Sequence, residues 1–344
     1  MTRQSVQTSR GDRVPSPPSL WMGLGIGAIA LLLCLVASTI YGATDISLRE
    51  VYEALTAFDG STEHLIIQTI RLPRSFIALL VGSALAVAGA LMQGLTRNPL
   101  ASPGILGINA GAAFAIVTAT FLFSDRALSF YVWFAFLGAG LTAISVYLLG
   151  SLGRGGLTPL NLTIAGAAFT AFLASLTQGI LIVNQRTFDD IRFWLAGSLA
   201  GRDLTLLLQV LPYLCVGFLL AFALGKPLAT LSLGEDVAKG LGQSVVWVKG
   251  LAALSIVLLA GSSVAIAGPI GFIGLIVPHI VRFGVGSDYR WILPYAAIAG
   301  GILLLLADLG SRLVLRPSEL PVGFITPLLG APFFIYLARS KIKQ

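Results

Sequence analysis

The most polar stretch of the chain, residues 232–250 (SLGEDVAKGLGQSVVWVKG), has the residue types of a protein-docking element. Two acids, two lysines and four glycines lie there, in a chain that is otherwise largely apolar. Ser232 and Glu235 match the S-x-x-E capping box, in which the serine caps a helix start and the glutamate reaches back to it. This pattern predicts a short helix that runs to about Lys239.

Glycines and apolar residues complete this stretch. Gly240 and Gly242 are expected to end the short helix and turn the chain, and Ser244 is expected to cap the next helix. Such a segment is either an ordered connector or a docking element for a partner. Its valines, Leu241 and Trp247 among few charges favour docking, because protein partners bind through apolar contacts with polar rims.

Three arginines and an aspartate form a second candidate for binding. Arg71 and Arg74, in RLPR, are three residues apart, which puts both on one face of a helix. They either anchor that helix at the membrane interface with snorkelling stems or dock an acidic partner. Asp308 and Arg312 have the i, i+4 spacing of an ion pair within one helix, which contributes about 0.2–0.5 kcal/mol.

The elements that must position these residues are membrane helices. Hydrophobic residues make up 56% of the 344 residues and charged residues 11%, with a mean hydropathy of +0.90. A soluble domain carries about 25% charged residues. We therefore predict an all-α polytopic membrane protein with about ten transmembrane helices. The apolar ranges expected to cross are 21–42, 63–95, 104–123, 129–150, 158–183, 204–224, 247–265, 268–280, 291–314 and 321–338.

The charge distribution orients these ten predicted spans. An even number of spans leaves both termini on one side, where 13 basic residues and four acids fall, against nine and 11 on the other side. The positive-inside rule then places both termini, and the loop at about 225–248, in the cytoplasm. Residues 1–20 are expected to be a disordered cytoplasmic tail before a single transmembrane domain over 21–340. The net charge of +7 is thus a topology signal and does not indicate nucleic-acid binding.

Several kinds of chemistry lack the residues that they need. No G-x-x-x-x-G-K-[ST] loop occurs, so another chain must hydrolyse any ATP that drives this protein. No acids or histidines are evident in the middle of the predicted spans, which argues against coupling to an ion gradient. Cys34 and Cys215 are expected to be buried small side chains, and His279 a cap or packing residue. We predict no catalytic cluster and no metal site.

Four segments, in order, resemble the FecCD family of bacterial ABC importer permeases for iron chelates and cobalamin. They are IRLPRSFIALLVGSALAVAGALMQGLTRNPLASPGILG, LGEDVAKGLG, GPIGFIGLIVPHIVR and LLLLADLGSRLVLRPSELPVGFITPLLGAPFFIYLARS. The resemblance covers about residues 45–340 and implies ten transmembrane helices in each of two paired permease subunits. It also implies two ATPase subunits below, which hold ATP and Mg²⁺, and an extracytoplasmic substrate-binding protein above. No cofactor is expected on this chain.

The resemblance implies roles for particular residues as well. Those expected to couple to the ATPase are Ser232, Leu233, Gly234, Glu235, Asp236, Ala238, Lys239, Gly240, Leu241 and Gly242. Arg71, Arg74 and Arg312 match family positions that pair with acidic residues of the binding protein. Thr158, Pro159, Leu160 and Asn161 match a corner beside the cytoplasmic gate, although a plain turn would explain them equally.

These features predict the permease subunit of an ATP-driven importer in the bacterial cytoplasmic (inner) membrane, which moves a metal chelate by alternating access. A ferric siderophore is the expected substrate, with haem or cobalamin as alternatives. The second permease subunit is another copy of this chain or a paralogue. A stand-alone ion-coupled transporter would need buried ionisable residues, and an intramembrane enzyme would need a catalytic cluster; neither is evident in the sequence.

Overall fold

The computed structural model describes residues 17–42, 46–123, 126–152, 158–316 and 318–342, and every regular element among them is a helix. The predicted all-α fold is confirmed. The elements are α1 Pro17–Ile40, α2 Leu48–Thr56, α3 Thr62–Ile66, η1 Ile67–Arg71, α4 Leu72–Thr96, η2 Pro103–Leu106, α5 Ile108–Leu122, α6 Leu128–Ser151, α7 Pro159–Val183, α8 Gln185–Leu195, α9 Leu204–Ala223, α10 Gly225–Ser232, α11 Glu235–Gly240, α12 Val245–Ala267, α13 Ile273–Val285, α14 Tyr289–Leu313 and α15 Val322–Ile342.

The apolar helices occupy the ten ranges that the hydropathy predicts. Among the described residues, seven helices are long and apolar enough to cross a bilayer, and three shorter apolar helices cover Ile108–Leu122, Ile273–Val285 and Val322–Phe333. The long second range is one continuous helical run, Thr62–Thr96, with a π-helical segment at Ile67–Arg71. Most of the predicted tail lies outside the described residues, but α1 begins at Pro17, so residues 17–20 are helical.

Helix α4 forms the centre of the bundle, and small residues let other helices approach it closely. It packs against α12, α13 and α14. A Cβ on Gly89 would lie 1.9 Å from the carbonyl oxygen of Gly274, and one on Gly82 would lie 2.3 Å from that of Gly300. Since these distances are shorter than any real contact, only glycine permits the two helix crossings, as is common where membrane helices pack tightly.

The short eighth range is a helix that begins after a break. Helix α12 ends at Ala267, and Gly268 follows with φ of 73°, where a Cβ would lie 2.0 Å from the carbonyl oxygen of Trp194. Phe272 also has a positive φ, 68°, before α13 begins at Ile273. The chain therefore turns back within the bundle, where neighbouring helices shelter the non-helical backbone.

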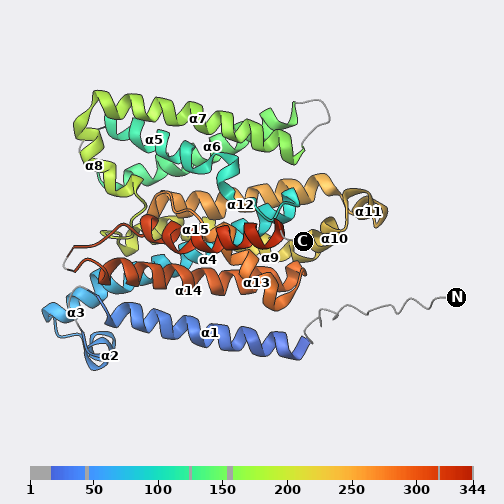
Figure 1. The fold of residues 1–344 in the computed structure, drawn as a ribbon. Coiled ribbons are helices and arrows are strands. Elements are labelled where there is room, and N and C mark those ends of the chain that lie inside the picture. The colour runs from blue at the N-terminus through green and yellow to red at the C-terminus, as the bar shows by residue number, and fades with distance from the viewer. Residues whose placement is uncertain (1–16, 43–45, 124–125, 153–157, 317, 343–344) are drawn as a thin grey trace.

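Figure 1 shows a bundle with two distinct ends. The start of α1, the end of α15 and the short helices α10 and α11 lie at one end, which we call the α10–α11 end. Helices α2, α3 and α8 lie at the opposite end, which we call the α8 end. The two candidate sites that the sequence indicates therefore lie at opposite ends of the same helices.

Candidate functional site

The polar stretch at 232–250 holds the end of α10, all of α11 and the start of α12, so that α10 and α11 form a helix pair joined to α12. Its predicted capping box is wrong. Helix α10 runs on to Ser232, whose hydroxyl donates to the carbonyl of Ala229 at 2.6 Å. The residue before α11 is Gly234, with φ of 128° and no side-chain cap. Because Ser232 already lies in the last turn of one helix, it cannot also cap the next. Gly234 makes the sharp turn between them.

The bend after α11 also differs in detail from its prediction. Gly242 has φ of 81°, whereas Gly240 ends α11 without a positive φ. Ser244 precedes α12 as expected, but its side chain makes no capping hydrogen bond. Gln243 holds the bend instead: its amide N–H donates to Ala238 at 2.9 Å and its side chain to Pro227 at 3.0 Å.

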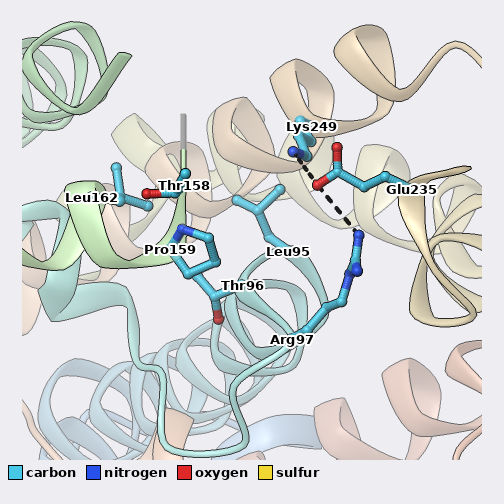
Figure 2. A pocket seen from close by; sticks show the side chains of 8 residues that line it. All are labelled: Leu95, Thr96, Arg97, Thr158, Pro159, Leu162, Glu235 and Lys249. Carbon is cyan, nitrogen blue, oxygen red and sulfur yellow. Dashed lines mark hydrogen bonds and ion pairs between the residues drawn. The ribbon is translucent and has the colours of Figure 1, made fainter. Parts of the chain in front are cut away.

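Glu235 ties this helix pair to two long helices. Its carboxylate accepts from Lys249 of α12 at 2.7 Å and lies 3.3 Å from the guanidinium of Arg97, directly after α4. Figure 2 shows the two basic groups converging on this carboxylate. The Lys249 hydrogen bond, together with the nearby charges, holds the pKa of Glu235 below its usual value. Arg97 has φ of 50°, a conformation that is strained for any residue but glycine.

The outward face of the same element is apolar. Ala238 of α11 is fully buried, so one side of this helix packs against the rest of the protein. The neighbouring large side chains are exposed, and they are Leu233, Val237, Leu241, Val246 and Trp247. An apolar patch with a polar rim on a fixed element is typical of a protein interface.

A cavity of about 280 Å³ lies between this element and the start of α7. Two of the predicted gate residues, Thr158 and Pro159, line it together with Glu235 and Lys249 (Figure 2). Thr158 caps α7 by accepting from the amide of Asn161 at 3.1 Å. Asn161 and the exposed Leu160 do not line the cavity. The structure thus brings half of the predicted gate corner to the coupling element; residues 154–157 of that corner lie outside the described residues.

The three arginines at the α8 end are not exposed, which corrects their expected location. Arg74 and Arg312 are buried, and both bind the carboxylate of Asp308, with nitrogen–oxygen distances of 2.9 Å and 3.0 Å. Arg74 also lies 2.6 Å from a carboxylate oxygen of Glu319, and Arg312 donates to the hydroxyl of Ser38 at 2.6 Å. The predicted ion pair between Asp308 and Arg312 is confirmed, but it belongs to a larger buried cluster.

Arg71 points to a different neighbour from Arg74. Its guanidinium donates to the carbonyl of Thr39 at 2.9 Å and to that of Ile40, at the end of α1. The π-helical segment ends at Arg71, whose contacts go to the end of α1, whereas Arg74 pairs with Asp308 of α14. Both side chains hold helices together in this structure.

The sequence indicated several of the site residues but not the residues that form ion pairs with them. Arg97, Lys249 and Glu319 were counted only as charges, although each forms an ion pair with a site residue. Opposite charges near the same membrane face are the one signal that could have found them. His279 packs against Phe283 and Phe333, as expected for a packing residue. Cys215 is exposed on α9, so the expectation that it is buried is wrong.

Comparisons with known proteins agree on one family. The model of the FecCD transport family matches residues 30–340. The Bacillus subtilis protein YfiZ, named as a probable siderophore transport system permease, is 52% identical over 94% of this chain and 98% of its own length. The iron(3+)-hydroxamate import system permease FhuB of the same organism is 47% identical, over 96% of this chain and 88% of its own.

A solved structure with a similar fold agrees with this family assignment. It is described as an inward-facing ABC transporter of the metal-chelate type, and it matches with a TM-score of 0.82 and 30% identity. The match covers 94% of this chain and 99% of the other. With its apolar helices, the chain is a multi-pass membrane protein. The chain therefore belongs to the FecCD transport family.

Proposed function

We propose that this chain is the permease subunit of an ATP-driven importer that moves a metal chelate, with a ferric siderophore as its substrate, across the bacterial cytoplasmic (inner) membrane. The named functions of its close relatives support this substrate class. With ten crossings, the bias of basic residues supports a cytoplasmic position of the α10–α11 end. A second permease subunit, as another copy or a paralogue, completes the pathway.

The observation that carries the proposal is the construction of the α10–α11 element. Its exposed apolar residues face away from the bundle, while Glu235 is joined to α4 through Arg97 and to α12 through Lys249. A separate ATPase subunit docked on Leu233 and Leu241 would therefore act on two long helices at once. ATP and Mg²⁺ belong to that partner.

Alternating access follows from this attachment. The cavity beside Thr158 and Pro159 lies between the start of α7 and the attached element. When the two ATPases close on ATP, a shift of α11 changes the spacing of α4, α7 and α12 and so favours one state of the pathway over another. A ligand or partner moves such an equilibrium only by binding its states unequally.

The arginine cluster at the α8 end enters the proposal in an indirect role. Arg71, Arg74 and Arg312 are committed to partners within the chain, so we expect them to fix the shape of the surface on which an extracytoplasmic binding protein docks. Direct contact with acidic residues of that protein would require them to exchange those partners. Such an exchange costs free energy when the remaining charge stays buried.

The test is reconstitution. The chain is purified with its ATPase, placed in proteoliposomes with its binding protein, and supplied with a labelled ferric hydroxamate, ferric citrate, haem or cobalamin. We expect ATP-dependent uptake of a ferric siderophore above that of haem and cobalamin. Purification without any ATPase, together with uptake by the lone chain, would contradict the proposal and favour an ion-coupled carrier.

A further inference from the structure

A cavity of about 390 Å³ is lined in part by residues of α8. Helix α8 lies at the end of the bundle opposite to α10 and α11 (Figure 1). It is separate from the coupling element and from the buried cluster around Asp308. Its polar lining comes from α5, the start of α6, α8 and the loop before α9: Thr120, Arg126, Tyr131, Asp190 and Arg202. Its volume lies within the range of about 300–1,000 Å³ that small-molecule sites have.

Arg202 is the unusual group in this cavity. Its side chain is buried, with the residue 8% exposed, and its Nε donates to the carbonyl of Ser198 at 3.3 Å. A guanidinium has five N–H donors, and within the described part of the chain no other hydrogen bond from Arg202 is formed. No described carboxylate lies within 4.0 Å of it either. Arg202 lines the cavity, and only one of its five donors has a described partner.

Arg202 keeps its charge at neutral pH. Burial lowers the pKa of this guanidinium to about 10, which is still well above 7. A buried charge without a counter-ion is unfavourable, and proteins usually pair such a group. An anionic ligand in the cavity would supply the missing counter-charge.

The nearby acids do not supply it. Asp190 lies in the cavity wall but is exposed and beyond ion-pair distance. Asp203 is adjacent in sequence, but its carboxylate caps α9 by accepting from the amide of Leu206 at 2.9 Å. Arg126 adds a second positive charge to the wall, with its guanidinium 5.9 Å from the ring centre of Phe130. Among the residues that the structure describes, the cavity wall therefore has two basic groups and one acid.

We infer that this cavity is an anion site in which Arg202 binds a carboxylate or other oxyanion group of the incoming metal chelate. The planar fork of a guanidinium matches two oxygens of such a group at once. Ferric iron is a hard cation that oxygen donors chelate, carboxylates among them, so a ferric carboxylate chelate carries these groups. The cavity holds a small chelate or one arm of a larger one. This inference rests on the proposed function, which makes the α8 end the entry side.

The experiment measures anion binding to the purified permease–ATPase complex by equilibrium dialysis with labelled citrate, with ferric citrate and sulfate as competitors. We expect Arg202→Gln to weaken citrate binding at least tenfold and Arg202→Lys to weaken it less. Asp190→Asn, which removes the acid from the wall, should tighten it about threefold. The matched control is Asp189→Asn; Asp189 pairs with Arg192 on the surface at 3.7 Å and does not line the cavity. It should leave binding unchanged.

Weaker binding in Arg202→Gln and tighter binding in Asp190→Asn are the signature, and the tighter binding does not depend on Arg202→Gln folding well. Equal binding in wild type and in both Arg202 variants would overturn the inference, as would equal shifts in Asp190→Asn and Asp189→Asn. Competition by sulfate but not by ferric citrate would leave an inorganic anion site and overturn the chelate assignment. ATP-driven uptake without any citrate binding would overturn this inference alone, whereas failure of ATP-driven uptake in wild type would overturn the proposed function.

Discussion

Two clusters in which one acid binds two basic groups lie at opposite ends of the bundle and differ in burial. At the α8 end, Asp308 binds Arg74 and Arg312; at the α10–α11 end, Glu235 binds Lys249 and Arg97. Asp308 is fully buried, whereas the Glu235 side chain is 38% exposed. Because the first cluster is buried, breaking its ion pairs costs much free energy. Because the second is exposed to water, its ion pairs break and re-form at little cost. The first thus suits a fixed scaffold, and the second suits a joint that moves during transport.

The largest expected effect comes from removing the shared acid of the buried cluster. Asp308→Ala leaves two buried guanidinium groups without their common carboxylate, and loss of one partner from a buried ion pair destabilises a protein by about 3–5 kcal/mol. Little of the variant should be recovered folded in detergent, and its thermal midpoint should fall steeply. The control is Arg49→Ala, which breaks an exposed ion pair with Glu53. Similar midpoints for these two variants would remove the contrast between the clusters.

The next effect tests whether the exposed end is a docking surface. The double variant Leu233→Asp and Leu241→Asp places charges in the apolar patch, where a partner would have to bury them. ATPase recovery on co-purification should fall at least tenfold while the thermal midpoint of the permease stays near wild type, since both side chains are exposed. Val314→Asp changes an equally exposed apolar residue at the other end and should leave recovery unchanged. Equal loss in both would show a general defect in folding or insertion.

A smaller effect separates the two glycines of the bend. Gly242 has φ of 81°, so Gly242→Val should cost about 1–2 kcal/mol through left-handed strain and reduce ATPase-coupled transport. Gly240 lies in helical conformation, and a Cβ added there would meet no atom within 4 Å, so Gly240→Ala should be tolerated. Transport rates in vesicles and thermal midpoints of both variants measure this. A defect in Gly240→Ala with normal Gly242→Val would place the bend at the wrong glycine.

The smallest effect is the pH dependence of the exposed cluster. The pKa of Glu235 is lowered, chiefly by the Lys249 hydrogen bond, so this acid stabilises the fold above its unfolded pKa of about 4.3. That contribution is lost as the pH falls through the folded pKa. Because the side chain is partly exposed, screening keeps it below about 1 kcal/mol. The midpoint difference between wild type and Glu235→Gln should therefore exist at pH 7 and shrink as the pH falls through the folded pKa, and a constant difference would contradict the ion pair.

Local patterns predicted the helices well because hydropathy and helix length are properties of contiguous sequence. The ten apolar ranges and a short helix that ends near Lys239 both come from such patterns. The capping residue was wrong, since S-x-x-E cannot show that the preceding helix continues to Ser232. Local sequence patterns also could not predict which side chains form ion pairs with each other. Arg74 and Asp308 are 234 residues apart in sequence, so only packing brings them together.

The same limit applies to exposure. Positive charge in RLPR is equally compatible with a surface patch and with a buried cluster, and only the positions of Asp308 and Glu319 decide between them. Arg202 belongs to no sequence motif, and only the three-dimensional structure shows that no described carboxylate pairs with it.

The central claim is that ATP, acting through the α10–α11 element, drives this permease. The most direct measurement is uptake of a labelled ferric siderophore into proteoliposomes that contain the permease, its ATPase and its binding protein, after ionophores have collapsed the proton and sodium gradients. The account predicts full uptake with ATP, none without it, and loss of uptake in the Leu233→Asp and Leu241→Asp variant. Uptake that depends on a proton or sodium gradient and is the same with and without ATP would contradict an ATP-driven mechanism.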